Sequence, residues 1–518
     1  MIDNNIEFIK LRDIFSELLE PAALDADKAC WEFYINSTDD NMKTYQTLQE
    51  RVYDLYKNED FYNKFLTISR AGLSDNHLKK QLKNILREFD EEFNAGELKK
   101  QLRDTENRIA SKFNSYVPIV RGKELSKADI NKRLQFEKDT ELRKELYNAK
   151  IKSGDIIKED MIDFIKLRNK FAQTKGYNNY FEYTLAEIYE VDIRELTELL
   201  TDVYDKAKEY NTSIQNEQKS ELAKEFGIEP TELEQYHYGL LLNSNPAKII
   251  NEYITSKEMV VNLAKQSYSG MGYDIDNLPI VLDLFPRKNK NTHGFCFDIQ
   301  AGKDARILAN LTDDTNSIDT LFHELGHCVY CLGINENLPY FDRTQTPALT
   351  EAIAMMMGDL QQKEDILKDI VTDEILKKFK DYHKVSEAKF INNSMLIIDF
   401  EKSMYENPEQ DLPTLWHDLR VKYIGANETE PIDNAWATIP HYLSHPAYYQ
   451  NYFRADIMKA QMYKSLTIKL GKITQNKLTS TYLKDNLFKF GMSVEENALI
   501  EHFTGEKLSC TALCENLR

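Results

Sequence analysis

Apolar residues recur at helical spacing along most of this 518-residue chain. Over residues 5–150 the pattern predicts successive amphipathic helices; Leu78, Leu82 and Ile85, for example, recur every three or four positions. The same periodicity returns over 161–172. Only 18 glycines and 13 prolines interrupt the whole chain, so we expect long, uninterrupted helices.

The pattern changes to that of strands near residue 280. Leu278–Leu282 is a short β-prone run, and Thr292–Ile299 and Ala305–Leu311 predict two strands. The residues between these two strands, 300–304, include a glycine and predict a turn. After this hairpin the pattern is helical again to the C-terminus. The sequence therefore predicts a mainly α fold with one small β-sheet.

Composition limits the possible partners of the protein. The formal net charge is −19 and no large cluster of Lys and Arg is present, which argues against nucleic-acid binding. No apolar run is long enough for a membrane span, and the N-terminus lacks a signal-peptide pattern. The six cysteines are sparse, so we expect reduced thiols in a soluble, cytoplasmic protein.

The segment His323-Glu-Leu-Gly-His327 contains the pattern H-E-x-x-H. On a helix, residues i and i+4 share a face, so both imidazoles can reach one metal ion, and Glu324 lies beside them, within reach of the metal's water. Asn316 or Ser317 is the expected N-cap of this helix. The alternative is a metal-free helix that carries two surface histidines.

A third ligand is expected in the next helix. Thr346 and Pro347 predict an N-cap and a first-turn proline, and Glu351 is the only carboxylate early in the apolar helix that follows. A buried carboxylate needs compensation, which a metal ion supplies. Catalytic zinc takes three protein ligands and one water. The sequence therefore predicts one Zn²⁺ per chain, held by His323, His327 and Glu351, with Glu324 as the catalytic base.

These motifs resemble those of the helical zinc peptidases related to angiotensin-converting enzyme, thimet oligopeptidase and oligoendopeptidase F. HELGH is followed by T-E-A-I-A, in which Glu351 lies 24 positions after His327. Other similar stretches lie at 167–183, 290–308, 436–441 and 448–452. The resemblance runs from about residue 160 to the C-terminus. Residues 1–150 share with the family only a pattern of successive helices.

This resemblance implies a single peptidase unit, 1–518, of two helical lobes around a deep central channel. Its N-terminal helical region would span about 1–150, and its catalytic region, with the small sheet beside the zinc helix, about 160–518. Such a channel excludes folded proteins and admits short peptides. The strand Thr292–Ile299 is then an exposed edge to which a peptide backbone adds by β-augmentation.

The resemblance also implies roles for further residues. Transition-state donors are expected at His441 and Tyr452, with Tyr449 as the alternative tyrosine. Substrate-binding residues are expected at Gly294, Phe295, Cys296 and Tyr449.

Two positions depart from the pattern of angiotensin-converting enzyme. That enzyme has an acid four residues after its glutamate ligand, where this chain has Met355, so Asp319 and Asp359 are the candidates for supporting the zinc histidines. Angiotensin-converting enzyme also has a lysine that binds the carboxylate of the substrate, at a position where this chain has Ile439. A peptidyl-dipeptidase is therefore less well supported than an oligopeptidase.

Cys328 and Cys331 form a C-x-x-C pair directly after the second histidine. A second metal site needs two more soft ligands, and the sequence indicates none, so we expect thiols that pack within the helix.

The predicted function is that of a zinc-dependent oligopeptidase that hydrolyses internal bonds of short, unstructured peptides. The alternatives are a peptidyl-dipeptidase or metallocarboxypeptidase of the same fold, and a non-catalytic peptide-binding protein. The predicted partners are short peptides, with neither nucleic acid nor membrane; the oligomeric state is left open.

Overall fold

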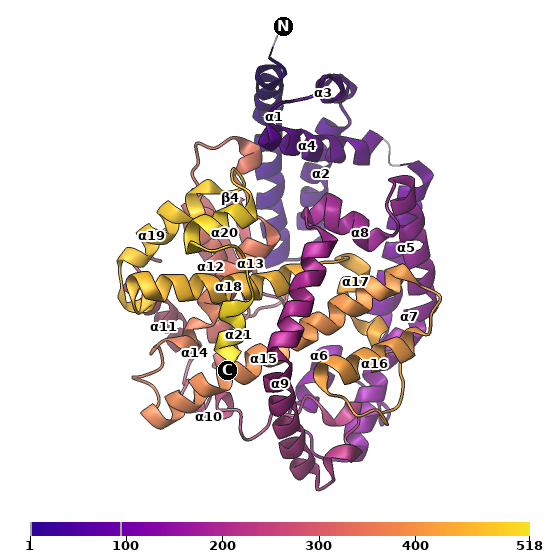
Figure 1. The fold of residues 1–518 in the computed structure, drawn as a ribbon, viewed down its shortest axis with the longest axis vertical. Helices are drawn as coiled ribbons and strands as arrows, with labels where there is room; N and C mark the ends of the chain where they lie inside the picture. Colours follow the sequence, from indigo (N-terminus) through magenta and orange to yellow (C-terminus); the bar gives the residue numbers. More distant parts are fainter. Residues whose placement is uncertain (1–2, 94–95, 518) are drawn as a thin grey trace. The chain divides into compact units, whose positions relative to one another are not determined.

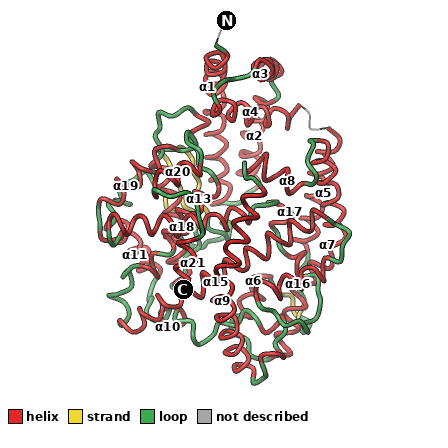
Figure 2. The backbone as a smooth tube through the Cα atoms, in the orientation of Figure 1, coloured by secondary structure: helices red, strands yellow, loops and turns green. Residues whose placement is uncertain are grey.

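The computed structural model describes residues 3–93 and 96–517, and helices make up most of them (Figure 1; Figure 2). The predicted mainly α fold is confirmed. Within the residues described, no helix has both the length and the apolar character needed to cross a bilayer.

The helices of the first half of the chain are α1 (Asn4–Ile35), α2 (Asp39–Tyr56), α3 (Glu59–Ala71), α4 (Asn76–Phe93), α5 (Gly96–Ser115), α6 (Lys127–Leu134), α7 (Thr140–Thr174), α8 (Tyr180–Thr184), α9 (Ile193–Phe226), α10 (Ala247–Ile250) and α11 (Lys257–Gly270). Those of the second half are α12 (Thr315–Gly333), α13 (Pro347–Gly358), α14 (Leu360–Lys363), α15 (Asp373–Glu406), α16 (Leu412–Ile424), α17 (His441–Ser444), α18 (Tyr449–Leu470), α19 (Leu478–Asn486), α20 (Glu496–Thr504) and α21 (Thr511–Leu517). The strands are β1 (Ile119–Val120), β2 (Lys123–Glu124), β3 (Ile280–Asp283), β4 (Phe295–Gln300) and β5 (Asp304–Leu308).

The chain forms two compact units, each assembled from separate stretches. The first unit comprises Met1–Gly96, Ile250–Asp373 and Met458–Leu508. The second comprises Glu97–Ile249, Glu374–Ile457 and Ser509–Arg518. Within the first unit, α1 packs against α2, α3, α4 and also β4. The expected division near residue 150, between an N-terminal helical region and a catalytic region, stays a prediction. That each unit corresponds to one of the two predicted lobes stays a prediction.

An aromatic cluster holds α1, α3 and α4 of the first unit together. The ring of Phe15 in α1 lies 5.8 Å from Phe65 and 5.3 Å from Phe89, centroid to centroid. All three side chains are fully buried, and Leu82 and Ile85 of α4 join the same cluster. The helical spacing of apolar residues in α4 therefore marks its buried face, as predicted.

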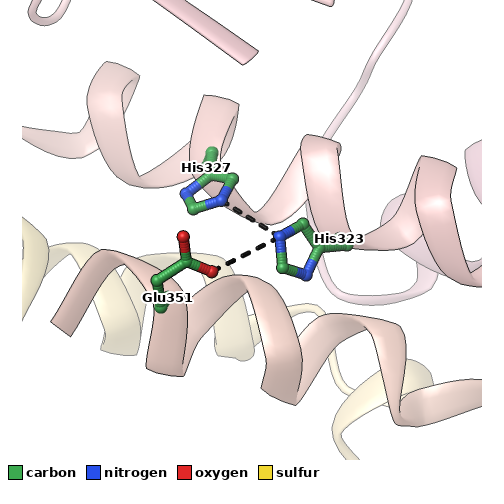
Figure 3. Close-up of side chains that lie close together, drawn as sticks. All are labelled: His323, His327 and Glu351. Atoms are coloured by element: carbon green, nitrogen blue, oxygen red, sulfur yellow. Dashed lines mark hydrogen bonds and ion pairs between the residues drawn. The ribbon is translucent and has the colours of Figure 1, made fainter. Parts of the chain in front are cut away.

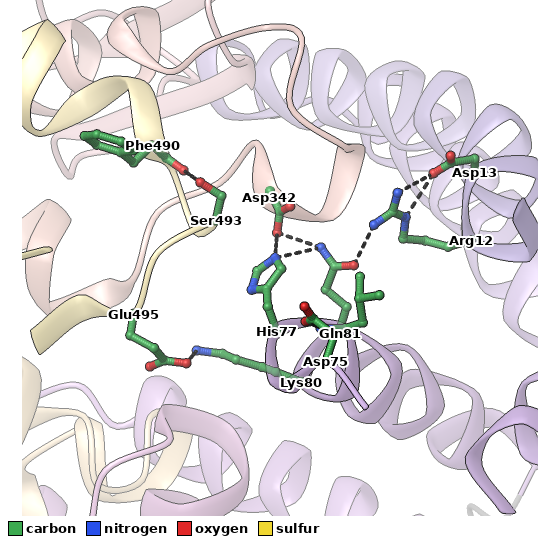
Figure 4. Close-up of polar contacts among 11 residues, drawn as sticks. Arg12, Asp13, Asp75, His77, Lys80, Gln81, Asp342, Phe490, Ser493 and Glu495 are labelled. Atoms are coloured by element: carbon green, nitrogen blue, oxygen red, sulfur yellow. Dashed lines mark hydrogen bonds and ion pairs between the residues drawn. The ribbon is translucent and has the colours of Figure 1, made fainter. Parts of the chain in front are cut away.

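A buried polar network ties α1 and α4 to the short turn Tyr340–Asp342 (Figure 4). Arg12 donates to the Gln81 Oε1 atom at 2.8 Å, and Gln81 Nε2 donates to Asp342 Oδ1 at 2.7 Å. The imidazole of His77 also contacts this Asp342 oxygen, at 2.9 Å. Because a buried polar atom left without a partner is costly, these hydrogen bonds fix the segment that leads into α13.

The small sheet of the first unit has the strand order β3-β5-β4. β3 runs parallel to β5, whereas β4 and β5 form the predicted antiparallel hairpin, with an irregular register between Phe297 and Gln300. Among the described residues β4 therefore pairs on one side only, which agrees with the expected edge strand. Phe297 packs on Trp31 of α1, so alternate residues of β4 face the opposite way.

Lys290 anchors the loop that enters β4. Its ammonium group is buried and donates to the carbonyl oxygens of Asp283, Phe285 and Ala309, and it pairs with the Asp283 carboxylate at 2.9 Å. A buried ammonium group is tolerated only with such partners. The start of the edge strand is therefore fixed to the ends of β3 and β5.

The second unit is organised around the long helix α7. The buried guanidinium of Arg143 donates to the backbone carbonyls of Leu134, Tyr236 and Tyr238, among others. Farther along α7, a Cβ at Gly154 would lie 2.7 Å from the Asn434 carbonyl oxygen. Glycine is therefore needed for the close packing of the 435–438 turn on α7.

Candidate metal centre and active site

The helix α12 carries both histidines of the H-E-x-x-H motif. It begins two or three residues earlier than expected: Asp314 is its N-cap and accepts a hydrogen bond from the Ser317 N–H at 2.8 Å. The prediction of Asn316 or Ser317 as the N-cap was therefore wrong. Ser317 Oγ instead accepts the N–H of Thr312, which fixes the loop before the helix.

The helix α13 carries Glu351 and begins as predicted, with Thr346 at the N-cap position and Pro347 in the first turn. The Thr346 hydroxyl donates to Glu496 instead of capping the helix. α13 lies very close to α12, because a Cβ at Gly326 would stand 2.9 Å from Ala354 Cα. The glycine of H-E-L-G-H is therefore what allows Glu351 to approach the two histidines.

The three expected ligand side chains point toward one another (Figure 3). The Nε2 atoms of His323 and His327 are 3.2 Å apart, and His323 Nε2 lies 3.6 Å from Glu351 Oε2. One donor atom from each of the three residues lies within 4.8 Å of the others. The structure thus brings together the two histidines and the carboxylate as a candidate metal-binding group.

These separations fit a zinc ion. Zinc–nitrogen and zinc–oxygen bonds of about 2.0–2.1 Å in a tetrahedron place neighbouring ligand atoms about 3.3–3.4 Å apart. The two distances at His323 lie on either side of this value. The donor set, two imidazoles and one carboxylate, is that of hydrolytic zinc sites with one position left for water.

Thr350 holds the ring of His327 and was not identified from the sequence. Its Oγ1 atom lies 2.7 Å from His327 Nδ1. A proton on Nδ1 that is donated to this hydroxyl leaves the lone pair of Nε2 free for a metal. Of the two candidates named from the sequence, Asp359 acts on His323: its charge opposes the lowering of the imidazole pKa.

The surroundings keep the imidazoles neutral and Glu324 basic. Burial lowers the pKa of His323 to about 4. Burial also lowers the pKa of His327, and the neighbouring His323 makes a smaller contribution in the same direction. Burial raises the pKa of Glu324 to about 8, and the negative charge of Glu351 adds to this rise. Neutral imidazoles are metal ligands, and a carboxylate with a pKa near neutrality is suited to taking up and releasing a proton.

The edge strand β4 begins beside Glu324. The carboxylate of Glu324 accepts a hydrogen bond from the backbone N–H of Cys296, and a Cβ at Gly294 would lie 3.5 Å from Glu324 Oε1. The Phe295 side chain is 37% exposed. The structure therefore places Gly294, Phe295 and Cys296, the residues expected to bind substrate, next to the expected base.

His441, Tyr449 and Tyr452 lie together in the second unit. The His441 ring is 4.8 Å from that of Tyr449 and 6.3 Å from that of Tyr452, centroid to centroid. Burial lowers the pKa of His441, with a smaller contribution from His445. The three residues thus form one aromatic cluster; their action on a substrate at the metal centre stays a prediction.

Two buried charged residues, which the sequence did not identify as functional, hold the segment that carries His441. Arg168 of α7 donates to the carbonyl oxygens of Tyr442 and Leu443 at 2.7 and 2.5 Å. Glu401 of α15 accepts the N–H of Ala447 at 2.9 Å. Ala447 has a φ of +56°, a left-handed conformation that residues with a side chain rarely adopt. These bonds hold the segment in that conformation.

Two family comparisons agree with this site. The model of the carboxypeptidase Taq (M32) metallopeptidases matches residues 67–357, more than half of the chain, and that of peptidase family M3 matches 278–518. Their overlap, 278–357, contains the three-stranded sheet, α12 and all of α13 except its last residue. Oligopeptidase A of Salmonella typhimurium is 21% identical over 69% of this chain, which spans 61% of that relative's length. The chain therefore belongs to the carboxypeptidase Taq (M32) metallopeptidases, and its residues 278–518 are similar to peptidase family M3.

Proposed function

We propose that the protein is a zinc-dependent oligopeptidase that hydrolyses internal bonds of short, unstructured peptides. The observation that carries the proposal is the convergence of His323, His327 and Glu351 beside Glu324 and an open strand edge. Membership of the metallopeptidase families supports peptide-bond hydrolysis as the reaction. One zinc ion per chain is the expected cofactor, and the absence of a helix that could span a membrane, among the residues described, is compatible with a cytoplasmic site of action.

Zinc, when bound by His323, His327 and Glu351, would polarise the scissile carbonyl and make a water acidic enough to be deprotonated near neutral pH. Glu324 takes the proton from the attacking water and later delivers it to the leaving amine. Its raised pKa suits both transfers. Thr350 keeps His327 in the orientation and tautomer that expose Nε2.

The backbone of a peptide substrate would pair with the free side of β4. Pairing through main-chain N–H and C=O groups orients the substrate but contacts few of its side chains. We therefore expect the enzyme to accept peptides of many sequences. Because Cys296 N–H is engaged by Glu324, the same strand also positions the base. Gly294 lies next to the proposed base, since a Cβ there would make a van der Waals contact with the Glu324 carboxylate.

His441 and Tyr452 are the proposed donors to the negative charge that develops on the carbonyl oxygen. Their support is the resemblance of 436–441 and 448–452 to the family pattern, together with the contacts of these rings in the second unit. Tyr449 is proposed as a substrate-binding residue, since it packs on both rings.

A carboxypeptidase is the second candidate, because the carboxypeptidase Taq model covers more of the chain than the M3 model does. Exopeptidases of this kind need the free C-terminal carboxylate of their substrate. The experiment that separates the two is product mapping by mass spectrometry on one peptide library with free and amidated C-termini. An oligopeptidase cuts both libraries at internal bonds; loss of cleavage on amidation would show carboxypeptidase activity instead.

Absence of cleavage in both libraries at full zinc occupancy would favour a peptide-binding protein without activity. Zinc is therefore quantified by elemental analysis in the same preparation, with the His323→Ala variant as the control for zinc bound elsewhere.

A further inference from the structure

A group of thiols lies directly behind Glu324, between α12 and β4. The Sγ atoms of Cys296 and Cys328 are only 3.2 Å apart. Cys296 Sγ is also 3.4 Å from Asp298 Oδ1, and Cys331 forms a side-chain hydrogen bond with the same carboxylate. The sequence predicted Cys328 and Cys331 as packing thiols with no further soft group nearby. The third thiol, Cys296, is distant in the sequence and comes close to them because β4 packs against α12.

The periodicities of the two elements produce this group. Glu324, Cys328 and Cys331 stand at i, i+4 and i+7 of α12 and therefore share one face of the helix. On β4, Cys296 and Asp298 are alternate residues and face this side, whereas Phe297 packs on Trp31 of α1. Cys296 and Cys328 therefore lie on the same side of α12 as Glu324, one helical turn farther along the helix.

We propose that Cys296 and Cys328 form a reversible disulfide when the protein meets hydrogen peroxide, and that this bond slows peptide hydrolysis. The Cys296 thiolate attacks the peroxide, breaks the O–O bond and becomes a sulfenic acid with release of hydroxide, which takes up the proton the thiol lost, to give water. The Cys328 thiol then attacks that sulfur; the S–S bond forms, and the sulfenic oxygen leaves as a second water. Two thiols are oxidised and one peroxide is reduced to two waters.

Within this group of thiols, proximity and access favour the Cys296–Cys328 pair over a pair that includes Cys331. Cys296 is partly exposed, whereas Cys328 and Cys331 are buried, so peroxide meets Cys296 first. Cys331 forms a hydrogen bond with Asp298, whose Oδ2 atom accepts the Gln345 side-chain amide at 2.8 Å. Burial raises the pKa of Cys296 and Cys328. This keeps both thiols protonated and makes the reaction slow, so the short distance between the sulfurs carries the inference.

The effect on hydrolysis follows from the contacts of Cys296 and rests on the proposed function. A disulfide has an S–S length of about 2.05 Å, so the two sulfurs must approach by about 1 Å. Cys296 N–H is the hydrogen-bond donor to Glu324, and its strand is the proposed substrate edge. Displacements of about 1 Å at a catalytic site reduce rates by up to ~10²-fold. We expect oxidation to lower kcat about tenfold or more, with zinc retained.

The test exposes the full-length, zinc-loaded protein to hydrogen peroxide, stops the reaction with catalase, blocks free thiols and maps tryptic peptides by mass spectrometry. Lys and Arg residues separate Cys296 from Cys328 in the sequence, so their disulfide joins two different peptides. Peptide hydrolysis and zinc content are measured on the same samples, before and after a phosphine reductant. We expect the joined peptides to accumulate as activity falls, and the reductant to reverse both changes.

Two variants separate this pair from other thiol chemistry. Cys331→Ala should behave as the wild type. Cys328→Ser should keep the activity of the reduced protein and give no joined peptides; prolonged peroxide then carries Cys296 on to the sulfinic acid, which the reductant does not restore. A Cys328–Cys331 disulfide, an oxidised protein that lacks the Cys296–Cys328 bond, or full activity with the bond formed would each overturn the proposal. Peptide mapping decides the thiol chemistry even if the reduced protein hydrolyses no peptide, an outcome that refutes the proposed function alone.

Discussion

The hydroxyl of Thr350 should contribute strongly to zinc affinity, although Thr350 is not one of the three expected ligands. In Thr350→Val the side chain keeps its shape but loses the oxygen that lies 2.7 Å from His327 Nδ1. A buried N–H without an acceptor costs about 1–3 kcal/mol. Since about 1.4 kcal/mol corresponds to a tenfold change in affinity, zinc should bind about 10- to 100-fold more weakly, as is typical for partners of metal ligands.

The assay is equilibrium competition for zinc with a chromophoric chelator, on wild type and variants at fixed pH. Thr350→Ser, which keeps a hydroxyl, should retain an affinity close to that of wild type. Thr346→Val is the matched control, because its hydroxyl lies on the same helix but donates to Glu496. Equal zinc affinity of Thr350→Val and wild type would refute the argument that the hydroxyl orients His327.

Three other substitutions test neighbouring parts of the site. Glu351→Ala should reduce zinc content as severely as His323→Ala, and wild-type occupancy in the Glu351 variant would remove it from the ligand set. Tyr452→Phe should lower kcat about 10²-fold with little change in KM, the usual cost of one transition-state donor; unchanged kcat on several peptides would exclude that role. Gly326→Ala should weaken zinc binding in the same competition assay and lower the unfolding free energy of the zinc-free protein by about 1–2 kcal/mol, because overpacking outweighs the gain in helix propensity; a variant as stable as wild type would contradict the close packing on Ala354.

Local patterns in the sequence were sufficient to predict the helices and to select the three side chains that the structure brings together as a candidate metal-binding group. The i, i+4 spacing of His323 and His327 depends only on helix geometry, and Glu351 stood out as a carboxylate in an apolar helix. The hairpin was also predicted, although β4 ends one residue later than expected and β5 ends at Leu308. The helix start was missed because several residues before α12 can cap a helix, and the choice of Asp314 depends on the loop at Thr312.

Contacts between distant segments could not be predicted in this way. Nothing in the local sequence indicates that Thr350 faces His327, because this contact depends on how closely α12 and α13 pack. The pairing of Cys296 with Cys328 joins positions on a strand and a helix and has no short-range signal. The composition of the two compact units, each assembled from separate stretches of the chain, has no short-range signal either.

The most direct test of the account compares peptide hydrolysis by wild type and Glu324→Gln at equal zinc content. The amide keeps the shape of the side chain but cannot accept the proton of the attacking water, so kcat should fall by about 10²–10⁴-fold while one zinc per chain remains bound. A Glu324→Gln protein with full zinc and more than about a tenth of wild-type activity would contradict a base at this position.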